Sequence, residues 1–323
     1  RGGGGRGVGA TAAREQREKQ SANSTAANSS SVPSELSLAH SSPLQLFHSS
    51  PVHSVAWLRN AECNSGTLAC LTARGAHLYR VDVPSHSNAA ILGTATPGTM
   101  ARPSAYAVKP LFASYVLHTD FVNACMFAHG RLVTASDDQT VKTWDVQTAA
   151  NESVVRCTSP AVALAKDVRN PAVFAVGEAA GAVAFYDCRA KRIALRFRLS
   201  EASGADLHDV DWCPSTDSTT LGVAMGSSWS LWDIKMPNAA FVDRNAAHGS
   251  PAKHFRWSTT HPKLFATGSR EEVKLWNCSN PHTALAAVSG TTGAGVGSVS
   301  WLPDSATCCF TDGHMLRFCP VRM

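Results

Sequence analysis

Charged residues are scarce in this sequence. They make up 16% of its 323 residues and leave a formal net charge of +5. Because that positive balance is small, it does not indicate a groove for nucleic acid. Long apolar runs are also missing, so no segment is expected to cross a membrane as a helix, and the folded part of the chain should be soluble.

The ten cysteines and thirteen histidines lack the spacings that metal or redox chemistry requires. No C-x-x-C or H-x-x-x-H pair occurs, and the glycine-rich stretch Gly290–Gly297 lacks the G-K-[ST] ending of a phosphate-binding loop. No nucleophile–base motif or spaced pair of carboxylates is present either. We therefore predict that the chain is not an enzyme and needs no cofactor, metal or small-molecule substrate. Scattered, unpaired cysteines favour a reducing intracellular compartment, cytoplasmic or nuclear.

The first 42 residues have few large apolar side chains and are rich in Arg, Gly, Ala and Ser. Such a composition cannot bury enough surface to fold, so residues 1–42 are predicted to be a disordered arm and residues 43–323 a folded domain. Within the arm, Arg1–Gly9 (RGGGGRGVG) resembles the arginine–glycine segments that contact RNA. The alternative is a polar tail with no ligand.

From residue 50 onward, short apolar runs alternate with turn-forming residues, which is typical of an all-β protein. Aromatic residues that end short strands recur with spacings of 65, 42, 46, 44 and 42 residues. The members of this series are Tyr79, Trp144, Tyr186, Trp232, Trp276 and Phe318. A second aromatic series precedes most of them: Trp57, Phe127, Trp212, Trp257 and Trp301. Because repeats of this period form four-stranded blades that cover one another, the sequence predicts a β-propeller.

The spacing of 65 leaves about 20 residues unexplained by the repeat. Residues 84–109 are polar and punctuated by Pro and Gly, so we predict an inserted loop there. A seventh, degenerate blade is the alternative, but the stretch is too short to supply four strands. Six blades are therefore expected.

The segment LHTDFVNACMFAHGRLVTASDDQTVKTWDV resembles a nearly complete repeat of the WD family. The resemblance assigns His118, Ser136, Asp138 and Trp144 to that family's structural tetrad, in which the carboxylate holds the histidine and the serine links the histidine to the tryptophan. Catalysis by the His–Ser–Asp set is the alternative, but the tetrad accounts for the same residues without a substrate. The family also implies that an N-terminal strand, here Leu44–His48, completes the last blade by pairing with the C-terminal strand.

The other repeats depart from the tetrad pattern. Near Trp276, a histidine and a serine are kept (His248 and Ser269), but Glu271 stands where the family has Asp. The remaining repeats lack more of its members. The tetrad is therefore expected in the second blade alone.

The resemblance implies a protein-interaction scaffold or adaptor subunit of a multiprotein complex. Partners would bind the loops that lead into the first strand of a blade and those that join its second and third strands. The candidate contact residues in these loops are Asp120, Asp137, Trp229, Arg270, Glu271, Glu272 and His314. Trp229 is the exception, because it aligns with an inward valine and is expected to fill the blade.

Other functions remain open at this level. The chain is weakly similar to the receptor for the N-terminal peroxisomal targeting signal and, equally, to histone-binding propellers. A peptide or targeting-signal receptor is therefore one alternative, and an RNA- or ribonucleoprotein-associated propeller that uses the basic arm is another.

Overall fold

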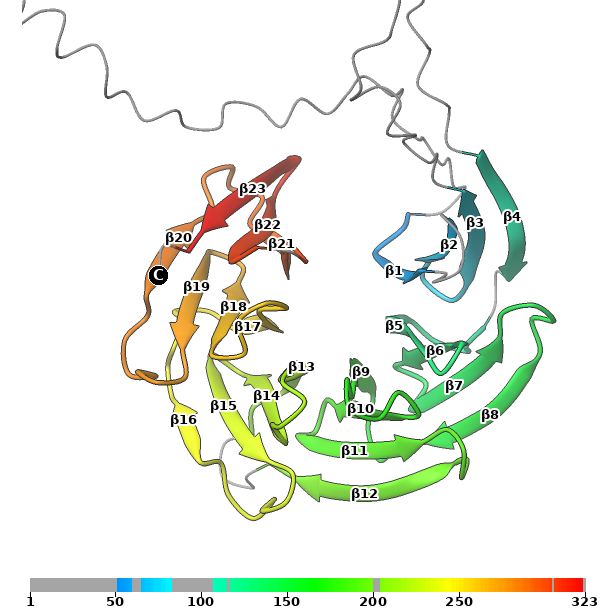
Figure 1. The fold of residues 1–323 in the computed structure, drawn as a ribbon, viewed down its shortest axis with the longest axis horizontal. Coiled ribbons are helices and arrows are strands. Elements are labelled where there is room, and N and C mark those ends of the chain that lie inside the picture. The colour runs from blue at the N-terminus through cyan, green and yellow to red at the C-terminus, as the bar shows by residue number, and fades with distance from the viewer. Residues whose placement is uncertain are drawn as a thin grey trace, which may run out of the picture. The chain divides into compact units, whose positions relative to one another are not determined.

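The computed structural model describes residues 51–59, 65–82, 107–114, 117–199, 204–303 and 305–321. All of them belong to one compact unit, which comprises Leu46–Ala95 and Tyr106–Met323. They form six antiparallel β-sheets that follow one another around a central axis, as the blades of a propeller do (Figure 1). The prediction of an all-β, six-bladed propeller is confirmed.

Each sheet is one blade, built from strands that are consecutive in the chain, with the first strand nearest the axis (Figure 1). Blade one consists of β1 (Ser54–Arg59), β2 (Ser65–Leu71), β3 (Ala76–Asp82) and β4 (Ala107–Ser114). Blade two consists of β5 (Val122–Ala128), β6 (Arg131–Ser136), β7 (Thr140–Asp145) and β8 (Asn151–Arg156). Blade three consists of β9 (Ala161–Lys166), β10 (Val173–Glu178), β11 (Ala182–Asp187) and β12 (Arg192–Arg198). Blade four consists of β13 (Leu207–Trp212), β14 (Thr220–Met225), β15 (Ser228–Asp233) and β16 (Val242–Arg244). Blade five consists of β17 (Ala252–Trp257), β18 (Leu264–Ser269), β19 (Glu272–Asn277) and β20 (Ala286–Ser289). Blade six consists of β21 (Val296–Trp301), β22 (Thr307–Asp312) and β23 (Met315–Pro320).

The extra length in the first repeat lies inside blade one, between β3 and β4. The predicted inserted loop at 84–109 extends too far, because residues 107–109 belong to β4, where Lys109 pairs with Arg80 of β3. The sequence did not indicate where this outer strand begins, because its first residues, Ala107–Lys109, follow a polar stretch and precede a proline. Three other predicted features lie outside the described residues: the arm at 1–42, its segment Arg1–Gly9 and the closing strand Leu44–His48.

Tight turns hold the registers within the blades. Ala128 of β5 pairs with Arg131 of β6, so only His129 and Gly130 connect the two strands. Both have positive φ angles, 48° and 72°. A two-residue turn of this kind matches the twist of an antiparallel pair and favours glycine at its second position.

Most members of the two aromatic series are buried between blades, but Trp57 and Phe318 are 47% and 53% exposed. By strand register, Phe318 corresponds to Leu275 and not to Trp276, so the first series is broken in blade six. The indole nitrogen of Trp257 donates a hydrogen bond to the carbonyl oxygen of Asp211 in blade four (3.2 Å), and that of Trp301 donates to the carbonyl of Arg256 in blade five (3.0 Å). Each of these tryptophans therefore reaches back to the first strand of the preceding blade. The repeat seen in the sequence is the repeat of these contacts, since a blade needs a neighbour to bury its faces.

Candidate interaction face

One end of the propeller carries the loops that lead into the first strand of each blade and the turns between second and third strands. Because the strands in a blade are antiparallel, these two kinds of loop lie at the same end of every sheet. We call this end the network face, because hydrogen-bond networks beneath it hold the loops to the blades. The turns between first and second strands, and between third and fourth, form the opposite face.

In blade two, the network is centred on His118, whose side chain is buried in the loop before β5. Its Nδ1 lies 2.9 Å from a carboxylate oxygen of Asp138, and its Nε2 lies 2.7 Å from the hydroxyl oxygen of Thr134. The indole nitrogen of Trp144 donates to the same hydroxyl at 3.0 Å. Since a carboxylate only accepts, Nδ1 carries the proton and Nε2 accepts from Thr134. Both ring nitrogens of His118, the hydroxyl of Thr134 and the indole nitrogen of Trp144 are thus paired.

The assignment of Ser136 to this tetrad is wrong. The hydroxyl between the histidine and the tryptophan belongs to Thr134, two residues earlier on the same face of β6. Ser136 lies at the end of the strand, where its oxygen accepts from the backbone N–H of Asp138 (3.1 Å) and its hydroxyl donates to the carbonyl of Asp120 (3.4 Å). Strand alternation could not separate the two hydroxyls, because both point to the same side.

The ionisation of this network is set by opposing effects. Burial works against the charge of Asp138, but hydrogen bonds from Thr140 and His118 outweigh it and lower the pKa of Asp138 to about 2. Burial lowers the pKa of His118, and this outweighs the opposing effect of Asp138. The histidine is therefore neutral and the carboxylate charged near pH 7.

Blade five has the same network, where the sequence predicted none. Thr267 accepts from the indole nitrogen of Trp276 (2.8 Å), and its hydroxyl lies 2.7 Å from Nε2 of His248. The carboxylate beside His248 Nδ1 is that of Glu272, at 3.3 Å, and not that of Glu271. The longer glutamate reaches the histidine from one position further along the chain, an adjustment that alignment by residue type did not find.

Blades three and six hold the same loop by a different network. The last residue of their second strand is a buried carboxylate, Glu178 or Asp312. The carboxylate of Glu178 accepts hydrogen bonds from the backbone N–H groups of Thr158 (2.7 Å) and Ser159 (3.2 Å), and forms an ion pair with Arg196 (2.8 Å).

In blade six, the carboxylate of Asp312 accepts from the backbone N–H of Thr291 (2.8 Å), from the hydroxyl of Thr292 (2.5 Å) and from Nε of Arg317 (2.9 Å). Hydrogen bonds from Thr291 and Thr292 lower the pKa of Asp312 well below its usual value. Both carboxylates were missed in the sequence. The available signal was an acidic residue aligned with Ser136 and Ser269, preceded in the chain by a loop rich in threonine and serine.

Four of the seven predicted contact residues are exposed on the network face: Asp120, Arg270, Glu271 and His314. Asp137 accepts a hydrogen bond from the side-chain amide of Asn123 (2.7 Å), so it supports its own turn.

Of the two remaining candidates, Trp229 fills the blade as expected, and Glu272 is corrected by the structure. Trp229 is only 1% exposed and packs edge-on against Phe265 and Trp276, as its alignment with an inward valine suggested. Glu272 belongs to the network of blade five, where Lys274 also binds it at 2.8 Å. Neither side chain is free to contact a partner.

Three of the exposed residues come from adjoining loops. The backbone of the loop before β21 is bonded to the turn that carries Arg270 and Glu271, through Val296 N–H to the Arg270 carbonyl and Gly290 N–H to the Glu271 carbonyl, both at 2.8 Å. Gly313, beside His314, donates to Gly295 in the same loop (3.4 Å). Arg270, Glu271 and His314 therefore form one polar cluster across blades five and six, whereas Asp120 lies on blade two.

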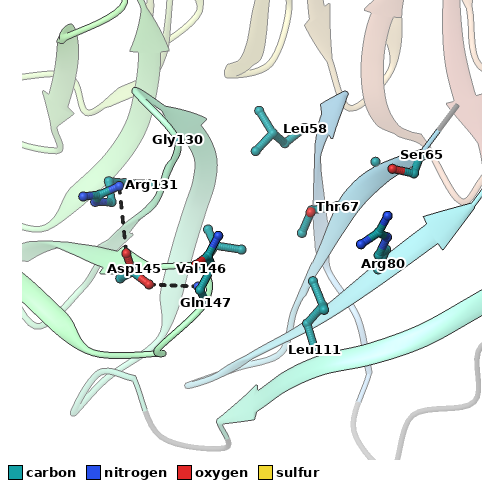
Figure 2. A pocket seen from close by; sticks show the side chains of 11 residues that line it. Leu58, Ser65, Thr67, Arg80, Leu111, Gly130, Arg131, Asp145, Val146 and Gln147 are labelled. Atoms are coloured by element: carbon teal, nitrogen blue, oxygen red, sulfur yellow. Dashed lines mark hydrogen bonds and ion pairs between the residues drawn. The ribbon is translucent and has the colours of Figure 1, made fainter. Parts of the chain in front are cut away.

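The opposite face has a pocket of about 750 Å³ between blades one and two. Figure 2 shows its lining, with Leu58 and Leu111 on one side and Arg131, Asp145 and Gln147 on the other. The charged groups are already engaged: Arg131 pairs with Glu152 at 2.6 Å, and Asp145 accepts from the backbone N–H of Gln147 at 2.9 Å. The third charged residue of the lining, Arg80, pairs with Asp82 at 3.2 Å, so each charged side chain there already has a partner.

Among the titratable side chains of the described residues, no group of three or more His, Cys, Asp or Glu is placed to hold a metal ion. Burial raises the pKa of Cys125 and Cys278 to about 12, which removes their thiolates as nucleophiles near pH 7. His118 is 1% exposed and bonded on both ring nitrogens, so no substrate can reach it.

Comparison with known proteins agrees with this architecture. A family model described as the TEP-1 C-terminal beta-propeller matches residues 118–187, which cover blade two and most of blade three. The fold is that of a WD-repeat β-propeller. A chain in a crystal structure of the mitotic checkpoint complex is similar in fold, with a TM-score of 0.60, 17% sequence identity, and 84% of this chain and 74% of that chain covered.

These likenesses do not reach beyond the fold. The propeller matches 1440 chains of known structure, so the architecture is too common to indicate one partner. No curated protein matches it in sequence. None of the described residues belongs to a helix able to span a membrane.

Proposed function

We propose that this propeller is a non-enzymatic interaction scaffold, an adaptor subunit that binds other proteins through its network face. The observation that supports this most is the cluster of Arg270, Glu271 and His314, exposed on loops that are bonded to one another across two blades. A rigid, polar surface of this kind suits protein recognition, because little conformational entropy is lost when a partner binds.

The networks beneath the loops add to this support. Each uses buried, hydrogen-bonded side chains to fix a loop whose outer residues face solvent. In blade six, Asp312 holds Thr291 and Thr292 from below, while His314 is exposed above the same blade. The similar chain in the mitotic checkpoint complex is part of a protein assembly, which favours protein partners here as well.

The cluster has both signs of charge, with Arg270 beside Glu271 and the acidic Asp120 on another blade. A surface that binds RNA would be expected to be uniformly basic. The network face therefore favours a protein or peptide over RNA. We propose an intracellular location, cytoplasmic or nuclear, because the scattered cysteines of the sequence favour a reducing compartment.

The test is affinity purification of the tagged full-length chain followed by mass spectrometry, at low and moderate salt. Arg270→Glu should remove a stoichiometric partner that the unchanged chain retains. Lys263→Glu is the matched control, since Lys263 is exposed on the same blade but at the opposite face. Equal recovery from both variants would contradict the proposed face.

Deletion of residues 1–42 separates the scaffold from the RNA alternative. A scaffold keeps its partners without the arm. If RNA and its bound proteins are recovered instead, and are lost with the arm or at the higher salt, the scaffold proposal fails.

A further inference from the structure

A second cavity on the opposite face lies between blades two and three and has a volume of about 210 Å³. Blade two lines it with side chains of β7 and β8 and with the turn between β5 and β6, and blade three lines it with the turn between β11 and β12. These elements meet at the end of the blades that is away from the network face. We call this space the second cavity.

Three hydroxyl groups form a chain at the buried side of the second cavity. The hydroxyl of Tyr186 donates to the oxygen of Ser153 (3.0 Å), and the oxygens of Ser153 and Thr143 lie 2.6 Å apart. Among the described residues these hydroxyls have no other partner, so three protons share two hydrogen bonds. The unused proton belongs to Ser153 or Thr143, and both line the cavity. Since Thr143 is only 4% exposed, a donor is left there that an oxygen of a bound group would satisfy.

The rim of the second cavity carries cations, and one of them has no carboxylate beside it. Arg131 pairs with Glu152 at 2.6 Å, and Arg189 pairs with Asp187 at 3.1 Å. Lys191 also lines the cavity and is exposed, and no acidic group of the described residues lies within ion-pair distance of its ammonium group. The cavity between blades one and two differs in this respect, because each of its charged side chains has a partner.

The backbone at Lys191 has a conformation that suits glycine. Its φ is 51°, in the left-handed region, where a residue with a Cβ atom is disfavoured. Ala149 lies the same number of residues after the third strand of blade two and has a φ of 59°. In blade three this unfavourable position places a charge on the rim of the cavity, which indicates a use for that charge.

We propose that the second cavity binds a phosphate monoester carried on a side chain of a partner protein. The donors come from three separate elements: a hydroxyl on β7 or β8, the exposed ring of His129 between β5 and β6, and the cations between β11 and β12. Of these cations, Arg189 binds Asp187 through Nε and Nη2, which leaves Nη1 for another acceptor. A phosphate group presents oxygens in several directions, whereas the two oxygens of a carboxylate lie in one plane with their carbon.

The size and surroundings of the second cavity favour a phosphorylated side chain over other phosphates. Pockets that enclose a whole small molecule have volumes of roughly 300–1,000 Å³, so this smaller cavity suits the phosphate at the end of a longer chain. The carboxylates of Asp145, Glu152 and Asp187 surround the cavity on the same face. They would repel an anionic membrane surface, but a single phosphate needs to contact only the cavity. This binding is independent of the network face.

Titration of the full chain with an alanine peptide that carries one phosphoserine, followed by phosphorus NMR, tests the proposal. The phosphate signal should shift in a saturable way. Lys191→Gly should weaken binding at least about tenfold, because a charge-assisted hydrogen bond is lost, and Lys191→Arg should retain it. Glycine accepts the left-handed conformation, so Lys191→Gly should not lower the thermal unfolding midpoint.

Two variants serve as controls. Ala149→Gly relieves the same backbone conformation in blade two without removing a charge, so it should bind the phosphopeptide as the unchanged chain does. Arg270→Glu should also leave this affinity unchanged. Failure of this proposal is therefore distinguishable from failure of the network face.

Four results would overturn the proposal. Equal affinity for the peptide with aspartate in place of phosphoserine would make the cavity a carboxylate site, and binding only to vesicles that contain a phosphatidylinositol phosphate would make it a lipid site. Equal affinity of the Lys191→Gly variant would place the phosphate elsewhere on the chain. The absence of a saturable shift with the unchanged chain would show that it binds no phosphate monoester.

Discussion

Blades two and five fix their loops with a histidine, whereas blades three and six use a carboxylate. In the first pair, His118 and His248 descend from the loop to a threonine on the second strand. In the second pair, the carboxylates of Glu178 and Asp312 belong to the strand, and the loop supplies N–H groups and hydroxyls to them. The same loop is thus held from opposite directions.

The position two residues before the end of the second strand explains why the two networks exclude each other. It is Thr134 or Thr267 in the histidine blades, and Val176 or Phe310 in the carboxylate blades. Without a hydroxyl there, a buried histidine would lack a partner for Nε2, which is costly in an apolar interior. Each of these four blades therefore needs a complete set of one kind.

The largest effect is expected from breaking a carboxylate network. Glu178→Ala leaves Arg196 without its carboxylate and two backbone N–H groups without an acceptor, so the free energy of unfolding should fall by about 3 kcal/mol. Urea unfolding measures this. Glu152→Ala is the control, because Glu152 is a partly exposed ion-pair partner on the rim and its loss should cost under about 1 kcal/mol.

Thr134→Val should come next and decides between the two hydroxyls of β6. It keeps the shape of the side chain but leaves Trp144 Nε1 and His118 Nε2 unpaired, which should cost about 2 kcal/mol. Ser136→Ala removes a long hydrogen bond to the Asp120 carbonyl and one bond within its own turn, and should cost about 0.5–1 kcal/mol. A larger loss from Ser136→Ala in urea unfolding would reinstate the serine as the linking residue.

Within the histidine pair, the carboxylate should matter more in blade two than in blade five. Asp138→Asn removes the negative charge 2.9 Å from its histidine and turns one of two accepting oxygens into a donor, and the Asp138 side chain is only 7% exposed. It should cost about 1–2 kcal/mol. Glu272→Gln should cost less, about 0.5 kcal/mol, because that carboxylate is more exposed and further from His248. Equal losses in thermal unfolding would mean that the two networks are equivalent.

The smallest expected effect is a loss of stability in mild acid that affects the histidine networks and spares the carboxylate networks. Burial lowers the pKa of His118 and of His248 below the ordinary value of 6.5, so the unfolded chain binds protons that the folded chain does not. The stability that these histidines contribute is therefore complete above pH 6.5 and is lost as the pH falls below it. The carboxylate of Asp312, whose pKa is lowered from 3.8, loses its contribution only below that pH.

Hydrogen exchange at about pH 7 and about pH 6, corrected for the intrinsic rate, checks this prediction. Residues 117–121 and 247–251 should lose protection at the lower pH, while residues 291–295 should not. Uniform loss over all blades would instead indicate a global response to charge.

The repeated blades could be predicted from the sequence because large aromatic side chains mark each repeat at a nearly fixed spacing. Trp257 and Trp301 mark the repeat, and each turned out to bond the preceding blade. The hydrogen-bond networks were harder to predict, since the residue that takes part is decided by how deeply its side chain lies below the loop. Thr134 and Ser136 are both small hydroxyl residues on one side of a strand, and only the position of the His118 ring distinguishes them.

The carboxylate of the blade-five network was also misplaced by alignment of the repeats. The turn between β18 and β19 is one residue shorter than the corresponding turn in blade two, so the alignment put Glu271 at the carboxylate position. The longer side chain of Glu272 fills it instead. A match by residue type and position cannot register a change in side-chain reach that compensates for a change in turn length.

The sequence by itself determined the architecture: a repeated pattern of strands and aromatics requires blades that stack, because one blade cannot bury both of its faces. The tertiary structure alone decided which members of the pattern are covered. Leu275 and Phe318 have equivalent places in their blades, yet one is buried and the other is half exposed. Burial is a property of the neighbouring sheet, and no residue carries that information in its own repeat.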